Sequence, residues 1–281
     1  MWTAANRNQY ARKGLRYPSD VTDAEWELVC PFLVSSKHRG SPSPERMRAI
    51  LNGVLYVLST GCQWRALPKD LPPRSTVHGW FVRWHCDGVL DRLHFALYQQ
   101  ARELAGKEES PTAAIVDSQS VKSVEKGGRR PDPVGYDAGK KVKGKKRHIN
   151  VDTLGLMLGL AVTPASVQDR DGFLPLLKQV RRLFVFLKRL FADGSYSGIE
   201  TAAAVKRVGK MGLEVVTRSD QARGFVVLAK RWIVERTFGW LGRCRRLAKD
   251  FEHLTRTQIA FVQLAMIRLM MRRIARVSSP S

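Results

Sequence analysis

Several features that would assign a chain to a familiar class are missing from this sequence. No window approaches 18 consecutive apolar residues, and the longest apolar run, Leu154 to Val162, is too short to cross a bilayer. The first 17 residues carry scattered Arg and Lys without the apolar stretch of a signal peptide, so secretion is not expected. No Cys-x-x-Cys pair occurs, and the cysteines lie far apart: Cys30, Cys62, Cys86 and Cys244. We therefore expect reduced thiols in a cytoplasmic protein, not a disulfide or zinc framework.

Acidic residues are scarce relative to basic ones. The 281 residues include 48 Lys and Arg against 25 Asp and Glu, which gives a formal net charge of +23. Self-repulsion of this size costs stability unless a polyanion compensates it; nucleic acid is the first candidate and an anionic membrane the second. Apolar residues make up 44% of the chain, which excludes a disordered basic tail. The composition thus predicts a folded protein that binds nucleic acid.

The positive charge is unevenly distributed along the chain. Residues 1–108 hold 15 basic and 10 acidic side chains, whereas residues 109–281 hold 33 and 15. We expect two domains with these bounds, the second carrying a basic insertion loop at 122–147. That segment has ten basic and three acidic residues and is rich in Gly and Pro. It predicts a mobile loop or a long hairpin arm that contacts phosphate; a solvated loop without a partner is the alternative.

The first of these domains has the pattern of a helical module. Helices are predicted over 24–33, 44–60, 75–88 and 89–105, and Pro31 is expected to end or kink the first of them at Cys30. Short helices joined by turns that contain Gly and Pro, and carrying Arg65, Arg74 and Arg83, fit a helix-turn-helix-like domain that binds DNA. A packing unit without DNA contacts fits the pattern equally well.

The second domain alternates between strands and helices. Strands are predicted over 113–121, 146–153 and 156–165, then one that ends at Asp193, and a last one over 213–219. Helices are predicted over 169–187, 199–211, 231–249 and 253–276. Three consecutive strands, followed by alternating helix and strand, predict a mixed sheet covered by helices.

Two aspartates end apolar strands in the same way. Asp117 follows Ala-Ala-Ile-Val, Asp193 follows Leu-Phe-Ala, and a small residue comes next in both cases. A carboxylate at the end of a core strand points into the crevice where sheet proteins bind ligands. Each Asp could instead begin a turn or cap a helix. Two matching cases in a protein that must hold a polyanion favour a functional site.

Glu235 is the third candidate carboxylate. On a helical wheel of residues 231–251 it lies opposite an apolar stripe that we expect in the core: Ile233, Trp240, Cys244, Leu247 and Phe251. The face around Glu235 is basic and contains two glycines, which would let a bulky partner approach the backbone: Arg231, Gly239, Gly242, Arg246 and Lys249. An ordinary solvent-facing glutamate paired with Arg231 fits the same wheel.

Motif-length segments run through nearly the whole chain. They are YPSDVTDAEWELVCPFL and GCQWRALPKDLPPRSTVHGWFVRW, then VDSQSVK, GYDAGKKVKGKKRHINVDTLG, PASVQDRDG and FADGSY, and finally RWIVERTFGWLGRCRRLAKDFEHLTRT. In these segments the chain resembles bacterial insertion-sequence transposases of the DDE type, specifically insertion-sequence family five within the IS4/IS5-like group. The related Tyr-x2-Arg-x3-Glu-x6-Lys signature is partly kept. Arg231 and Glu235 match it, whereas Leu228 and Gly242 replace Tyr and Lys, and Arg243 comes one residue late.

The resemblance implies a fold and a chemistry. The fold class is α/β: an RNase H-like mixed-sheet catalytic core preceded by a small all-helical, helix-turn-helix-like domain. Asp117, Asp193 and Glu235 are the implied catalytic triad and the ligands of two Mg2+ ions, for which Mn2+ can substitute. Three clustered carboxylates need such cations, because like charges otherwise repel. The implied enzyme cleaves phosphodiester bonds at the terminal inverted repeats of an insertion sequence and joins the freed 3′-OH to target DNA.

The implied partner is double-stranded DNA, held by a homodimer in a synaptic complex in the cytoplasm, at the bacterial nucleoid. Most expected contacts are with phosphate, and Trp232 is expected to stack on a flipped base. The expected DNA-binding residues are Arg231, Arg246, Lys249, Arg243, Lys140, Lys141, Lys143, Lys145, Lys146, Arg147, Arg83 and Trp232. The alternatives are a catalytically silent DNA-binding protein with the same fold and a basic RNA-binding or ribosomal protein. The complete triad argues against the first, and the carboxylate pattern argues against the second.

Overall fold

The structure is a computed structural model, and it describes residues 12, 14–34, 42–125, 131–216 and 230–278. The chain forms two compact units. Unit 1 comprises Met1–Lys107, Cys244–Arg246 and Gln263–Ser281, and unit 2 comprises Glu108–Arg243 and Leu247–Val262. The end of the chain therefore clusters with the N-terminal segment, whereas a division into domains at residues 108 and 109 stays a prediction.

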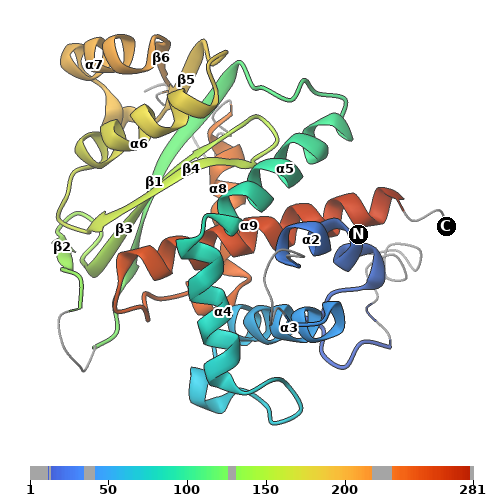
Figure 1. Cartoon of the computed structure of the whole chain (residues 1–281). Helices are drawn as coiled ribbons and strands as arrows, with labels where there is room; N and C mark the ends of the chain where they lie inside the picture. Colours follow the sequence, from blue (N-terminus) through green and yellow to red (C-terminus); the bar gives the residue numbers. More distant parts are fainter. Residues whose placement is uncertain (1–11, 13, 35–41, 126–130, 217–229, 279–281) are drawn as a thin grey trace, which may run out of the picture. The chain divides into compact units, whose positions relative to one another are not determined.

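Unit 1 is helical (Figure 1). Its elements are α2 (Asp23–Leu33), α3 (Pro44–Thr60), the 3-10 helix η1 (Trp64–Ala66), α4 (Arg74–Cys86), α5 (Val89–Glu103) and the second part of α9 (Thr255–Ser278). Ser43 caps α3, which has Pro44 in its first turn and ends at Gly61 in the left-handed region, with φ 71°. The four helices predicted between residues 24 and 105 are thereby confirmed.

The expected break at Pro31 is wrong, because α2 continues through it to Leu33. A proline inside a helix removes one backbone hydrogen bond and crowds the preceding turn. Here only the last turn is affected, and the Val34 N–H closes it by donating to the Cys30 carbonyl at 2.9 Å. Val29 and Leu33 are buried, so core packing holds this turn in place.

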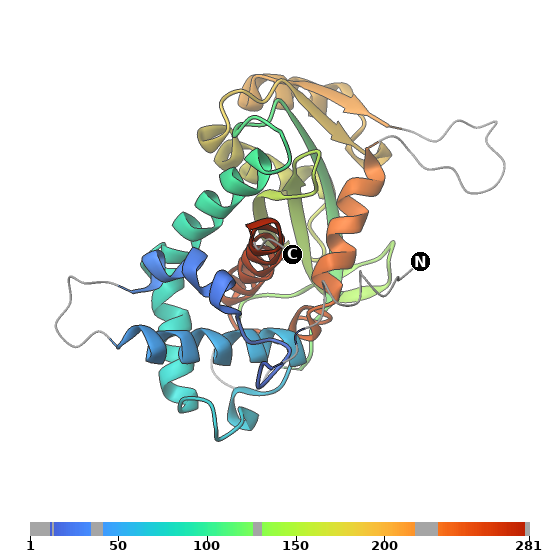
Figure 2. The same cartoon turned by 90° about the vertical axis from the view of Figure 1, so that its right-hand side faces the viewer.

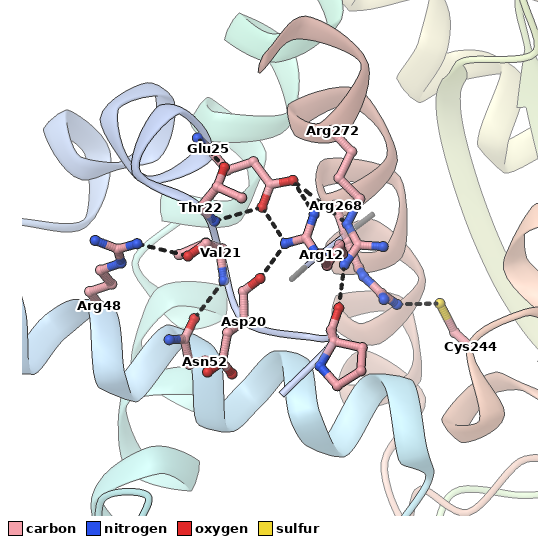
Figure 3. A network of polar contacts seen from close by, with 11 residues as sticks. Arg12, Asp20, Val21, Thr22, Glu25, Arg48, Asn52, Cys244, Arg268 and Arg272 are labelled. Atoms are coloured by element: carbon pink, nitrogen blue, oxygen red, sulfur yellow. Dashed lines mark hydrogen bonds and ion pairs between the residues drawn. The ribbon is translucent and has the colours of Figure 1, made fainter. Parts of the chain in front are cut away.

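A buried ionic network ties α2 to the second part of α9 within unit 1 (Figure 3). The Glu25 carboxylate accepts hydrogen bonds from the Arg12 guanidinium at 2.6 and 2.7 Å, and Arg272 Nε lies 3.8 Å from Glu25 Oε1. Glu25 also accepts from the Thr22 N–H, which forms half of the capping box that begins α2. Burial, together with the charge of Arg268, lowers the pKa of Arg272 to about 9. Glu25 is thus the anion that compensates two largely buried cations.

Replacing Glu25 by Gln is expected to lower the free energy of unfolding by about 2–3 kcal/mol at neutral pH. Burial opposes ionisation, but the hydrogen bonds and charge of Arg12 hold the pKa of Glu25 below its ordinary 4.5. The folded pKa is below the unfolded one, so this stabilisation is complete above pH 4.5 and is lost as the pH falls through the folded value. Urea denaturation at neutral and acid pH measures both effects. Equal acid sensitivity in wild type and variant would contradict this role.

Unit 2 is built on a six-stranded mixed sheet (Figure 1). Its strands are β1 (Ala113–Lys122), β2 (Gly135–Asp137), β3 (Val142–Val151), β4 (Met157–Pro164), β5 (Arg189–Ala192) and β6 (Gly212–Val215). The order is β2-β3-β1-β5-β6, with β4 also paired to β3. β1 runs antiparallel to β3 and parallel to β5, and β5 runs parallel to β6. The expected α/β class is confirmed, whereas β2 was not predicted. The predicted strand 213–219 corresponds to β6, and its residues 217–219 lie outside the described part of the chain.

Helices cover the sheet on both faces (Figures 1 and 2). They are α6 (Asp169–Leu183) and α7 (Ile199–Gly209) on one face and α8 (Arg231–Gly242) on the other. The 3-10 helix η2 (Gly194–Tyr196) follows β5, and η3 (Arg245–Leu247) lies at the boundary between the units in the sequence. The predicted helix 231–249 is wrong beyond Gly242. Two glycines weaken its last turn, and the Arg243 N–H bonds back to the Trp240 carbonyl in a 3-10 pattern. Within the described ranges, no helix combines the length and apolar character needed to span a membrane.

The described part of the basic segment 122–147 contains the antiparallel pair β2–β3, which agrees with the hairpin arm and not with a loop throughout. Residues 135–137 form β2 and residues 142–147 begin β3, while residues 126–130 lie outside the described part. β3 is the central partner of β1, β2 and β4. Three basic side chains of β3 are enclosed by the fold, since Lys145, Lys146 and Arg147 are all buried, whereas Lys143 is exposed.

Two of these buried cations lie beside one aspartate. Lys145 Nζ is 3.0 Å from Thr255 Oγ1 and 4.0 Å from Asp250 Oδ2. Arg147 donates to the Leu247 carbonyl at 2.9 Å. Burial lowers the pKa of Arg147 to about 10, and the charge of Asp250 opposes this effect. A buried cation is tolerated only with such compensation. The side chains of Lys145 and Arg147 therefore make contacts inside unit 2.

Lys146 points to the other face of the sheet and is also buried. Its Nζ lies 2.8 Å from Asp169 Oδ1 and 3.6 Å from Asp137 Oδ2. It therefore joins β3 to the first turn of α6 and to β2. The expectation that Lys145, Lys146 and Arg147 contact DNA phosphate is wrong, because internal partners hold all three side chains away from the surface.

Candidate active site

Asp117 and Asp193 lie at the same level on neighbouring strands. In the parallel pairing of β1 with β5, Ala113 is opposite Arg189 and Ile115 is opposite Phe191. Two further residues along each strand lead to Asp117 and Asp193. Neighbouring strands are about 4.8 Å apart, so this register brings the two carboxylates close together. Asp193 directly follows β5, as the sequence predicted, whereas the prediction that Asp117 ends its strand is wrong, because β1 continues to Lys122.

The environment of Asp117 makes its ionisation costly. Burial, with the charge of Asp193 adding to it, raises the pKa of Asp117 to about 6. A hydrogen bond from the Ser118 N–H at 2.7 Å and the charges of Arg231 and Lys140 act in the opposite direction. The charges of the two aspartates therefore oppose each other, in addition to the larger effect of burial.

Asp193 is fixed by the turn that follows β5. Its carboxylate caps η2 by accepting from the Ser195 N–H at 2.9 Å, and it also accepts from the Ser195 hydroxyl. The turn interpretation was therefore correct locally, but it does not exclude a site. Asp193 Oδ2 also lies 3.8 Å from Arg231 Nη2, and the side chain remains 20% exposed. The Asp193 carboxylate thus caps η2 and is still partly accessible to solvent.

Glu235 is presented by the way α8 packs on β1 and β3. The buried stripe of α8 is Ile233, Val234, Thr237 and Leu241. Thr237 Oγ1 donates to the Gly155 carbonyl at 2.8 Å, which fixes the rotation of the helix. Glu235 points away from this stripe with 55% of its side chain exposed, as the wheel predicted. Its Oε1 lies 3.1 Å from Arg231 Nε.

Arg231 connects the candidate carboxylates. It contacts Asp193 and Glu235, and its charge also acts on Asp117. Among the residues that the structure describes, no three His, Cys, Asp or Glu side chains are grouped as metal ligands would be. The structure thus places Asp117 and Asp193 on neighbouring strands, and Arg231 links Asp193 to Glu235.

Tyr196 is a residue of this site that the sequence reasoning missed. Its side chain is fully buried, and its ring meets Phe173 of α6 edge to face. Burial raises the pKa of its hydroxyl well above the ordinary value, and the charges of Asp117, Asp169 and Asp193 add to this effect. Tyr196 therefore stays a neutral phenol beneath the carboxylates. Its place three residues after Asp193 was the only sequence signal for it.

The remaining expected DNA contacts differ in accessibility. Arg246 is buried and donates to the Cys62 carbonyl at 3.2 Å, so it is corrected to an internal residue of unit 1. Because α8 ends at Gly242, neither Arg246 nor Lys249 extends the face around Glu235. The exposed residues are Lys140, Lys141, Lys143, Arg243, Lys249 and Arg83. Trp232 is 43% exposed, but the Arg236 guanidinium lies 4.5 Å from the centre of its ring.

Two family models match the chain. The model described as "Transposase DDE domain" matches residues 108–270, which is more than half of the chain. The model described as "Putative transposase of IS4/5 family" matches residues 21–94. The chain therefore belongs to the DDE-type insertion-sequence transposases, and its mixed sheet with covering helices is the RNase H-like core of that class.

Curated relatives from Burkholderia cepacia agree with this family. The "Insertion element IS402 uncharacterized 16.2 kDa protein" is 37% identical over 110 residues, which cover 37% of this chain and 74% of that protein. The "Putative transposase for insertion sequence element IS402" is 32% identical over 129 residues, 43% of this chain and 60% of that protein. The chain thus matches less than two thirds of the second relative's length. No solved structure matches the chain.

The family implies a divalent metal, and the donor set can be compared with that requirement. Asp117, Asp193 and Glu235 offer only carboxylate oxygens, the ligands that Mg2+ prefers. The mutual repulsion of Asp117 and Asp193 is what a divalent cation would relieve. Glu235 is held by Arg231 and would join the pair only by leaving that partner. The residues therefore fit a metal in chemistry and in the placement of two of the three donors.

Proposed function

We propose that this protein binds the terminal inverted repeats of an insertion sequence, cleaves phosphodiester bonds at its ends and joins the 3′-OH to target DNA. The observation that carries the proposal is the level placement of Asp117 and Asp193 on neighbouring strands, with Glu235 linked to them through Arg231. Phosphoryl transfer of this kind needs clustered carboxylates on an open surface that also attracts DNA. The neighbouring positions of Asp117 and Asp193 and the exposed cations of unit 2 support the proposal.

Asp117, Asp193 and Glu235 would hold two Mg2+ ions, or Mn2+ in their place. When bound, such ions neutralise the carboxylates and stabilise the charge that develops on the attacking and leaving oxygens. The chain's own groups set the donors in place. The Ser118 N–H orients Asp117, and the Ser195 N–H and hydroxyl orient Asp193. Fixed second partners of this kind reduce the reorganisation that catalysis requires.

DNA would be held by the exposed cations around this site. We assign phosphate contacts to Arg231, Lys140, Lys141, Lys143, Arg243 and Lys249, a contact in unit 1 to Arg83, and base stacking to Trp232. Trp232 can stack on a base only if the Arg236 guanidinium moves aside. Two ends must be processed together, so we also propose a homodimer in the synaptic complex, acting in the cytoplasm at the nucleoid.

An end-cleavage assay tests the proposed function. The purified chain is incubated with a labelled duplex carrying the terminal repeat, once with Mg2+ and once with EDTA. We expect specific binding in both conditions and strand cleavage only with Mg2+. Specific binding without cleavage under any metal condition would instead establish the silent DNA-binding alternative. Cleavage that persists in EDTA would contradict a metal-dependent site.

A further inference from the structure

Arg231 contacts two of the three proposed metal ligands at the same time. Its Nη2 lies 3.8 Å from Asp193 Oδ2, and its Nε lies 3.1 Å from Glu235 Oε1. The first contact reaches from α8 to the end of β5, and the second runs one turn along α8. The Arg231 guanidinium therefore contacts carboxylate oxygens that would otherwise be available to bind a divalent cation.

We propose that Arg231 is a latch that competes with divalent cations for Asp193 and Glu235, and that DNA opens it by drawing the guanidinium to a phosphate. The inference rests on the proposed function, because it takes Asp193 and Glu235 as metal ligands. It makes full metal loading depend on bound DNA. Arg231 is thereby a positioning residue that acts through the two carboxylates.

The chemistry of arginine suits this exchange. A guanidinium keeps its charge at every physiological pH, so deprotonation does not release it from the carboxylates. Its fork of N–H donors matches phosphate as well as it matches carboxylate. DNA is therefore a natural competitor for this side chain, whereas a change in pH is not.

The exposure of Arg231 makes the latch reversible. Its side chain is 38% exposed and that of Glu235 is 55% exposed, so solvent weakens their pairing. Lys146, on β3 of the same unit, offers a contrast. Its Nζ is 2.8 Å from Asp169 Oδ1, and the two side chains are only 7% and 19% exposed. The buried pair is part of the fold, whereas the pairs of Arg231 can be exchanged without unfolding.

Metal and DNA should then strengthen each other's binding. Coupling between two ligands is reciprocal: if DNA raises the affinity for metal, metal raises the affinity for DNA by the same factor. Arg231 provides a physical element for this coupling, because each ligand favours the same released state of the side chain. Removing the latch should reduce the coupling and increase metal affinity in the absence of DNA.

Mn2+ affinity of the full chain without DNA is the first measurement, by titration calorimetry or by the electron paramagnetic resonance signal of free Mn2+. We expect Arg231→Gln to bind Mn2+ about 3- to 10-fold more tightly than wild type, the size that two partly exposed ion pairs allow. Arg231→Lys keeps the charge but not the fork, so we expect a smaller gain. If Arg231→Gln fails to fold, the Mn2+ affinity of Arg231→Lys is compared with that of wild type instead.

Lys140→Gln is the matched control for lost charge. Lys140 also acts on Asp117 electrostatically, but its Nζ lies near the Ser118 carbonyl, at 3.5 Å. An affinity of Arg231→Gln no higher than that of Lys140→Gln would overturn the latch, because general electrostatics would then explain the gain. An affinity equal to or lower than that of wild type would overturn it as well.

Two further arms complete the test. With a duplex of the terminal repeat that cannot be cleaved, we expect Mn2+ affinity to rise more in wild type than in Arg231→Gln; an equal rise would overturn DNA opening. Asp193→Asn should lose Mn2+ affinity. If it binds Mn2+ like wild type, the metal-site assignment of the proposed function fails. If it loses affinity while Arg231→Gln gains none, only the latch fails.

Discussion

Asp193→Asn is expected to reduce cleavage of a DNA end at least about 1000-fold, which corresponds to about 4 kcal/mol in the activation barrier. Asparagine keeps the size of the side chain and can still accept from the Ser195 N–H. It loses the charge that would hold a cation and that pairs with Arg231. DNA affinity measured in EDTA should not fall, because losing an acidic group from a basic surface removes a repulsion for phosphate.

Single-turnover cleavage of a pre-bound end separates catalysis from binding. Glu214→Gln is a matched control, since Glu214 is an exposed carboxylate on β6 of the same unit. The control should cleave at the rate of wild type. Asp193→Asn cleaving within tenfold of wild type would contradict the catalytic assignment of Asp193.

Asp250→Asn is expected to destabilise unit 2 by about 3–5 kcal/mol, the cost of leaving buried cations without their anion. Asp250 is fully buried and its Oδ2 lies 4.0 Å from Lys145 Nζ. Its charge also favours the protonated form of Arg147, and Ser123 Oγ donates to it at 2.6 Å. The substitution removes the charge and keeps the shape, so the loss measures electrostatic compensation.

Denaturant unfolding of wild type and variant gives this difference in free energy. Adding Lys145→Met to Asp250→Asn should recover part of the loss, because one buried cation is then removed with its partner. A loss below about 1 kcal/mol in the single variant would mean that Lys145 is well solvated, and would reopen its assignment as a DNA contact.

The three candidate carboxylates could be predicted from the sequence, because short local patterns in the sequence identify them. Asp193 directly follows the short apolar strand β5, and Asp117 follows the apolar first half of β1, which pairs in parallel with β5. Glu235 could be assigned to the open face of its helix because helical periodicity separates it from Ile233 and Leu241. These inferences need only neighbouring residues and a repeating geometry.

The burial of the basic side chains on β3 could not be predicted, because a count of charges does not show which acidic residues lie near them in the fold. Lys145 is adjacent to Asp250, and Lys146 is adjacent to Asp169. Both partners are far from the lysines in the chain and are brought to β3 only by the completed sheet. The same limit applies to Arg231, whose i,i+4 partner was evident from the wheel while its contact with Asp193 was not.

The most direct test of Asp193 as a metal ligand is a change of metal specificity in Asp193→Cys. Mg2+ prefers oxygen donors strongly, whereas Mn2+ accepts a sulfur ligand more readily. DNA-end cleavage by Asp193→Cys should therefore be lost with Mg2+ and restored by Mn2+, while wild type cleaves with both ions. Equal loss of cleavage in both metals would leave Asp193 without evidence of ligation, and equal activity in both would contradict its role at the metal site.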